Sequence, residues 1–127
     1  MRKCLYIIAL LLITACSKQV ADDLCCNLTL KLISPFEEPI IALSVDNSLP
    51  GNFIRNLNTG EEYDFPVFVN GKCEINVLKG VYVISFDGTA ALPDGSGRLV
   101  RSSEYSSPNN AVTLTEDGTV ELNLLIL

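Results

Sequence analysis

The chain has 127 residues, of which 9 are Lys or Arg and 15 are Asp or Glu, and its formal net charge is −6 at pH 7. This length fits one domain rather than two. So acidic a chain repels nucleic acid, which argues against a nucleic-acid-binding protein. Histidine is absent from the sequence, which excludes Ser-His and Cys-His catalytic pairs.

Residues 1–15 have the three parts of a secretory signal peptide. A basic head precedes an apolar run from Leu5 to Ile13, and two small residues, Thr14 and Ala15, follow it. A helix needs roughly 20 apolar residues to span a bilayer, and this run is well short of that. We therefore predict a cleaved signal rather than a lasting transmembrane helix.

The end of this segment, Ile13-Thr14-Ala15-Cys16, resembles the bacterial lipobox. The resemblance implies that the thiol of Cys16 is diacylated, that the signal is cut off before it and that the new amino group is acylated too. Each buried methylene contributes about 0.8 kcal/mol, and one acyl chain holds a protein only marginally, so three chains form a durable anchor. We expect Cys16 to bind the mature protein to a membrane through lipid.

The residues after Cys16 indicate which membrane this is. A serine directly after the cysteine, as at Ser17, resembles the pattern of lipoproteins that are released to the outer membrane. The pair Asp22-Asp23 resembles the acidic export tags of surface-exposed lipoproteins of Bacteroidetes, although it lies several residues past the cysteine. We expect an outer-membrane protein in which residues 16–26 are the lipidated cysteine and a flexible tether. The acidic pair favours the cell surface, and the periplasmic face is the alternative.

Three more cysteines follow: Cys25, Cys26 and Cys73. In an exported chain, one of the vicinal pair could bridge to Cys73. Such a bridge closes a loop of roughly 50 residues and contributes roughly 4 kcal/mol. The alternative, in which all three are small apolar residues or free thiols, has equal weight. A zinc site is less favoured, because three thiols lack a fourth ligand, and we predict no metal and no cofactor.

From residue 27 to residue 127 the pattern is that of one all-β domain. Alternating apolar residues predict strands over 27–33 and 40–45, and a shorter one over 53–57. Asn70-Gly71 is typical of a type I′ turn, so residues 62–69 and 72–78 should form a hairpin. In its first arm Tyr63, Phe65, Val67 and Val69 should share a face, and Pro66 should limit that arm to an edge or a bulge.

The remaining strands are expected over 81–86, where Asp87-Gly88 stops the strand, and then over 111–115 and 119–127, on either side of the turn EDG. Seven or eight short strands separated by Gly, Pro and Asn turns are typical of a sandwich or barrel. We predict an antiparallel β-sandwich of about seven strands. The nearly all-apolar end of the last strand favours burial on both faces, and the alternative is pairing with another subunit.

The stretch GKCEINVLKGVYVISFDG, residues 71–88, resembles the core of transthyretin-like (prealbumin-like), or carboxypeptidase-regulatory-like, β-sandwich domains. The match includes a Gly-x-Tyr step at Gly80-Val81-Tyr82, in which the tyrosine ring covers the core and its hydroxyl reaches polar partners. The family's opening turn is replaced here by SPFEEPI, residues 34–40, which puts the topology in doubt. The resemblance implies a non-catalytic spacer, partner-binding module or appendage module.

Two groups of polar residues are candidates for a site. The carboxylate pairs Glu37-Glu38 and Glu61-Glu62 are typical of solvated turns rather than of the paired acids of glycoside hydrolysis, so we predict no catalytic residue. Residues 93–110 form a long polar segment that contains Arg98, Arg101 and Tyr105. This composition is typical of binding loops.

The sequence thus predicts a lipid-anchored outer-membrane protein whose single domain is a non-catalytic binding or structural module. Its partner would be a protein or a glycan. The alternative is a subunit or assembly factor of a surface appendage that uses strand addition through residues 119–127.

Overall fold

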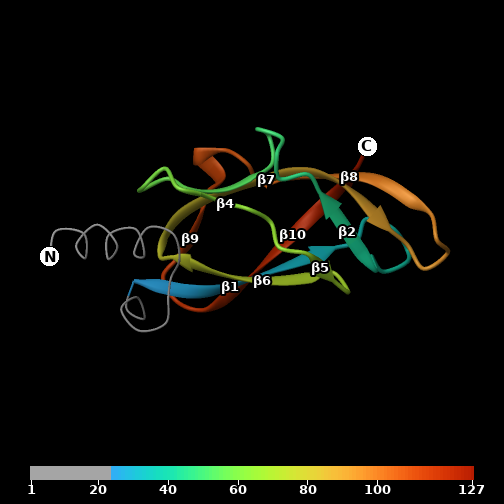
Figure 1. Cartoon of the computed structure of the whole chain (residues 1–127), viewed down its shortest axis with the longest axis horizontal. Coiled ribbons are helices and arrows are strands. Elements are labelled where there is room, and N and C mark those ends of the chain that lie inside the picture. The colour runs from blue at the N-terminus through green and yellow to red at the C-terminus, as the bar shows by residue number, and fades with distance from the viewer. Residues whose placement is uncertain (1–23) are drawn as a thin grey trace, which may run out of the picture.

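The computed structural model describes residues 24–127, and they form an all-β domain (Figure 1). The predictions for the signal peptide, for Cys16 and for most of the tether lie outside the described residues. The predicted all-β class is confirmed. No helix in the described part of the chain is long and apolar enough to cross a membrane.

Ten strands and one short 3₁₀ helix make up the domain, and the first strand begins two residues before the predicted domain boundary. They are β1 (Cys25–Ile33), β2 (Ala42–Val45), β3 (Phe53–Asn56), β4 (Glu62–Tyr63), β5 (Phe68–Val69), β6 (Lys72–Leu78), β7 (Gly80–Ala91), β8 (Gly97–Tyr105), η1 (Pro108–Asn110), β9 (Val112–Leu114) and β10 (Gly118–Ile126).

The sheet closes on itself as a barrel of seven strands in the order β2-β5-β6-β1-β10-β8-β7, with β2 returning to β7. Strands β3 and β4 extend from β7 as a ribbon, and β9 pairs with β7 beyond the end of β8. This pairing does not confirm a two-sheet sandwich or a transthyretin-like topology. One pair departs from the expected antiparallel arrangement, because β1 and β10 are parallel.

The predicted type I′ turn is confirmed, because Asn70 and Gly71 have φ angles of 52° and 80° and join β5 to β6. The predicted first arm is not one strand: β4 pairs with β3, whereas β5 pairs with β2 and β6. The predicted shared face is also wrong, since Phe65 is buried while Val67 and Val69 are 80% and 65% exposed. Pro66 lies where the chain crosses from the ribbon to the barrel wall, and the alternation changes phase there.

The seventh strand does not stop at Asp87-Gly88 as predicted. Strand β7 continues to Ala91, because Gly88 pairs with Val45 on one side and with Val100 on the other. A side chain at Gly88 would meet the backbone, since a Cβ built there lies 2.9 Å from the carbonyl oxygen of Ser44. Glycine serves here for close approach of β2 rather than for a turn.

The core fills the barrel with inward side chains from all the long strands. Phe65, Phe68 and Phe86 form an aromatic cluster, with the ring centroids of Phe65 and Phe86 5.0 Å apart. Tyr82 is fully buried, and its hydroxyl donates a hydrogen bond of 2.7 Å to the carbonyl of Leu78. Burial raises the pKa of Tyr82. The roles predicted for the Tyr82 ring and hydroxyl are confirmed.

Two asparagine side chains act in place of a neighbouring strand where the sheet is interrupted. Asn47 donates to the carbonyl of Phe65 at 3.1 Å and accepts the Phe65 N–H at 2.7 Å. Asn52 accepts the Asp87 N–H at 3.0 Å. Each amide satisfies backbone groups that no strand reaches, a role that the sequence pattern alone, which marks asparagine for turns, does not indicate.

The last strand is buried on one face only, so the prediction of burial on both faces is wrong. Val120, Leu122 and Leu124 are buried, whereas Leu125 and Leu127 are each 54% exposed. The reason is that β10 lies in a barrel wall, where one face of every strand points outward.

The possible bridge to Cys73 is absent, because Cys26 and Cys73 are both buried free thiols. In the β1–β6 pair, Cys73 lies opposite Leu30 and Cys26 lies opposite Val77. Four residues along a strand correspond to about 13 Å, and a disulfide needs Cα atoms within about 7 Å. Burial raises the pKa of both thiols, that of Cys73 to about 11. Cys25 is itself disulfide-bonded.

The close approach at Gly88 predicts a costly substitution. We expect Gly88→Ala to lower the free energy of unfolding by about 1–3 kcal/mol, since β2 must move away from β7. Gly51→Ala is the control, because nothing lies within 4 Å of a Cβ at Gly51. Urea unfolding of both variants measures the difference, and equal stabilities would contradict the close approach.

Candidate functional site

The structure does not bring Arg98, Arg101 and Tyr105 together. Half of the predicted binding segment, residues 97–105, is strand β8, and the rest includes a turn at residues 93–95 and η1. The guanidinium of Arg98 lies 4.9 Å from the ring centroid of Phe36, at one end of β8. Arg101 binds Asp87 on the outer face of the wall, and Tyr105 is half-buried at the other end of β8. The three side chains therefore belong to three environments.

The ion pair of Arg101 is the strongest charge contact of these three residues. Its Nε and one Nη donate to the two carboxylate oxygens of Asp87 at 2.7 and 3.0 Å. These hydrogen bonds hold the pKa of Asp87 below its ordinary value. The contact joins β7 and β8, and it engages both carboxylate oxygens of Asp87 and two donors of Arg101.

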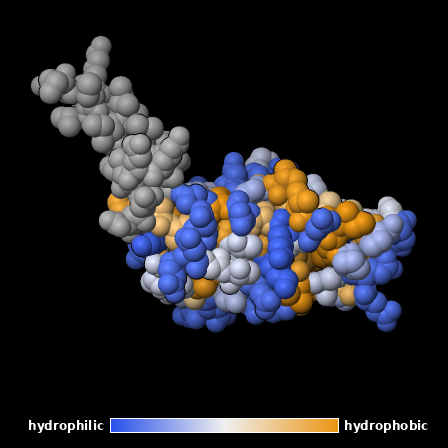
Figure 2. All heavy atoms as spheres, turned by 90° about the horizontal axis from the view of Figure 1, so that it is seen from below, coloured by the Kyte–Doolittle hydropathy of each residue, from blue (hydrophilic) through white to orange (hydrophobic). Residues whose placement is uncertain are grey.

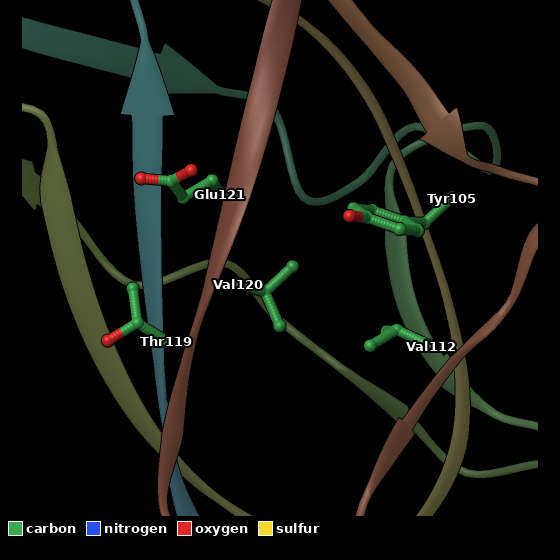
Figure 3. Close-up of a pocket in the computed structure, with 5 residues that line it drawn as sticks. All are labelled: Tyr105, Val112, Thr119, Val120 and Glu121. Carbon is green, nitrogen blue, oxygen red and sulfur yellow. The ribbon is translucent and has the colours of Figure 1, made fainter.

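A groove opens in the barrel wall at the Tyr105 end of β8. It has a volume of about 440 Å³ and is lined by Tyr105, Val112, Thr119, Val120 and Glu121. Figure 3 shows Tyr105, Val112 and Val120 pointing toward a common space, with Thr119 and Glu121 on the other side of the β10 ribbon. A second hollow of about 240 Å³ continues along residues 112–120.

The groove exists because β8 and β10 separate. Strand β8 pairs with β10 only over Leu124–Ile126. After β8 the chain continues through η1 into β9, which does not pair with β10. Strand β9 resumes along β7, and among residues 24–127 it pairs with no other strand. The first half of β10 pairs with β1 on its far side. Two strand edges consequently face the groove, and no strand of residues 24–127 lies between them.

The hydrogen bonds at the end of β10 show which backbone groups face the groove. The N–H of Leu127 donates to Leu99 and that of Asn123 donates to the Glu104 side chain, so odd-numbered residues point to the β8 side. Successive residues of a strand direct their N–H and C=O groups to opposite sides. The N–H and C=O of Thr119 and Glu121 therefore point into the gap.

The same reasoning applies to β9. The N–H and C=O of Val81 bond to Asn58 and Leu57, on the β3 side of β7. Thr113, which lies opposite Val81, is therefore turned away from β7. Its backbone N–H and C=O point toward the groove.

Glu104 caps the open edge of β10. Its carboxylate accepts the backbone N–H of Asn123 at 3.3 Å and the side-chain amide of the same residue at 3.2 Å. The Glu104 side chain thus replaces a strand partner at Asn123, next to the last residues of β10 that pair with β8. This role is not visible in the sequence, because Glu104 and Asn123 are 19 residues apart.

Acidic side chains surround the groove. Burial, followed by the charges of Glu104 and Glu121, raises the pKa of Tyr105. Glu121 forms an exposed ion pair of 3.8 Å with Lys31. Asp117, in the turn that closes the groove, accepts the Asn27 N–H at 2.8 Å. The groove is an apolar floor with backbone donors and acceptors and an acidic rim.

The carboxylate pairs do not form a site of their own. Glu37, Glu38 and Glu62 are exposed, Glu61 is partly buried, and Glu62 accepts a hydrogen bond of 2.7 Å from Arg55. Within residues 24–127, no three acidic, cysteine or histidine side chains converge to hold a metal ion.

No protein-family model matches the chain, and searches of the curated proteins and of the solved structures return no match.

The cap on β10 gives a prediction for amide exchange. In Glu104→Ala we expect the Asn123 amide to exchange about fivefold faster, equivalent to about 1 kcal/mol for the lost hydrogen bond. The Leu122 amide, on the β1 side of the strand, is the internal control and should not change. NMR-detected hydrogen exchange measures both, and equal acceleration would indicate general loosening instead.

The Asp87 ion pair gives a prediction for pH. Because the folded-state pKa of Asp87 is lowered, its contribution to stability is present above the ordinary carboxyl pKa and is lost as pH falls through the lowered value. In Arg101→Leu the Asp87 pKa should return upward, measured by NMR titration of the carboxyl carbon. Arg55→Leu, which removes a separate ion pair, should leave Asp87 unchanged. An unshifted Asp87 in Arg101→Leu would contradict the assigned cause.

Proposed function

We propose that the chain is a lipid-anchored protein of a bacterial outer membrane whose barrel is a non-catalytic binding or structural module. The observation that carries this is the sequence Ile13-Thr14-Ala15-Cys16 after a basic head and an apolar run. A lipobox in that position supports acylation at Cys16, and Ser17 and Asp22-Asp23 support surface display.

The non-catalytic role has support from the described side chains. Glu37 and Glu38 are exposed in the segment between β1 and β2. Glu61 is partly buried just before β4, and Glu62, in β4, is engaged with Arg55. Arg101 is likewise engaged with Asp87. The groove instead offers apolar surface and backbone groups, which suit binding better than acid-base chemistry.

A relation to transthyretin-like domains remains part of the proposal. It has support from residues 71–88, where β6 passes through Gly80 into β7 and the hydroxyl of Tyr82 bonds back to Leu78. The closed barrel and the parallel β1–β10 pair are the features that such a relation must accommodate.

The second candidate is a subunit or assembly factor of a surface appendage. The open edge beside β10 favours strand addition in which this chain receives a strand. Donation of residues 119–127 is less favoured, because β10 is held between β1 and β8 and supplies buried Leu122 and Leu124.

Acylation is the test of the anchor. In the native bacterium, an alkyne-tagged fatty acid should label the wild-type protein in the outer-membrane fraction, whereas Cys16→Ser should be unlabelled and retain its signal. Cys4→Ser is the matched control, since that residue leaves with the signal, and it should behave as wild type. An unlabelled, freely soluble wild-type protein would rule out the proposal.

A further inference from the structure

We propose that the open edge of β10 receives an extended, basic segment of a partner protein as an added strand. This inference rests on the proposed function as a binding module and names its ligand class. The segment would lie along Thr119–Glu121, with a small apolar side chain directed onto the floor formed by Tyr105, Val112 and Val120.

The backbone of β10 supplies the pairing groups. Thr119 and Glu121 are two residues apart and direct their N–H and C=O groups into the gap, which is the spacing at which an added strand forms its ladder. The other edge of the same strand is already paired with β1. Glu104 satisfies only the next N–H along, that of Asn123. The edge is thus held in strand geometry by β1 before any partner arrives.

The floor supplies the apolar contact. Val120 is 7% exposed, and Val112 and Tyr105 are partly buried against the core. In an added strand alternate side chains point to opposite faces, so every second residue of the segment would meet this floor. Burial of one valine-sized side chain stabilises a complex while the neighbouring residues stay at the surface.

The rim supplies the charge selection. Glu104 and Glu121 flank the edge, and Glu116 and Asp117 follow in the turn at its end. Lys31 only partly offsets them, through an exposed contact of 3.8 Å. Side chains of an added strand that point outward would lie beside these carboxylates, where Lys or Arg is favoured and Asp or Glu is repelled.

These features favour a polypeptide over a glycan. The polar groups that face the gap are backbone amides at strand spacing, and the Tyr105 ring points to the interior rather than presenting a flat outer platform (Figure 3). Strand addition uses the amides directly, because main-chain hydrogen bonds give affinity and alternate pockets give specificity.

The experiment uses the full acylated chain in detergent micelles, with the capped peptide acetyl-Val-Lys-Val-Lys-Val-amide as probe. Binding should slow hydrogen exchange of the Thr119 and Glu121 amides by about tenfold at a peptide concentration that gives near-saturation. The Val120 and Leu122 amides, which pair with β1, are the internal controls and should keep their rates. Binding should weaken as salt is raised.

Two matched probes separate the contributions. A peptide N-methylated at alternate residues, which cannot form the ladder, should not bind, and a peptide with Glu in place of Lys should bind at least about tenfold more weakly. In the protein, Glu121→Ala should weaken binding and reduce its salt dependence. The bound peptide should still protect the Thr119 amide, because the backbone groups of β10 are unchanged. Glu121→Pro also removes the N–H that faces the gap, with no bond to β1 lost, and should abolish protection at Thr119.

The exchange data decide the outcome. Binding of the N-methylated peptide as tightly as the parent, or binding without protection of Thr119 and Glu121, would overturn the proposal. So would absence of binding by a chain whose amide spectrum shows it to be folded. None of these results bears on acylation at Cys16, so a failure of strand addition leaves the anchor proposal intact. Conversely, an unacylated chain that still binds the peptide would refute the anchor and leave strand addition at β10 intact.

Discussion

The structure depends on giving every backbone N–H and C=O of a small sheet a partner. Closure achieves this through the four-residue strand β2, which bonds to β5 on one side and to β7 on the other. Gly88 permits the second contact, because no side chain holds the Ser44 carbonyl away. Where the ladders stop, Asn47, Asn52 and Glu104 offer amide or carboxylate atoms in place of a strand. An exposed edge would otherwise be a template for pairing with another chain.

The gap between β9 and β10 is the place where this constraint is met least completely. Strands β9 and β10 are consecutive and joined by a short turn, yet β9 follows β7 while β10 follows β1. In the described part of the chain, the core beneath the gap is covered by Tyr105, Val112 and Val120 rather than by a further strand. An edge that is held straight by one neighbour and left open on the other side suits recognition of an extended segment, because little ordering remains to be done on binding.

The parallel pairing of β1 and β10 also fixes where the groove lies. Gly118 is opposite Leu28, and the turn before it is tied to Asn27 by Asp117, so the groove begins at the end of the barrel where the described chain begins (Figure 1). The large exposed apolar residues are not among those that line the groove, and they include Val69 on β5, Leu99 on β8 and Leu125 on β10. Figure 2 shows apolar side chains gathered toward the half of the molecule that carries β2 and β5.

The sequence by itself determined the local structure. Alternation gave β1 and β6, and Asn70-Gly71 gave the turn, because these depend on side-chain period and on φ angles that few residues adopt. It also contained the lipobox-like segment on which the proposed anchor rests. Only the tertiary structure decided that Gly88 lies inside a strand, that Cys73 is distant from Cys26, and that Arg98, Arg101 and Tyr105 diverge. Closure, register between distant strands and the open edge of β10 depend on pairings between residues far apart in the chain, and composition and periodicity carry no information on which strand will be the neighbour.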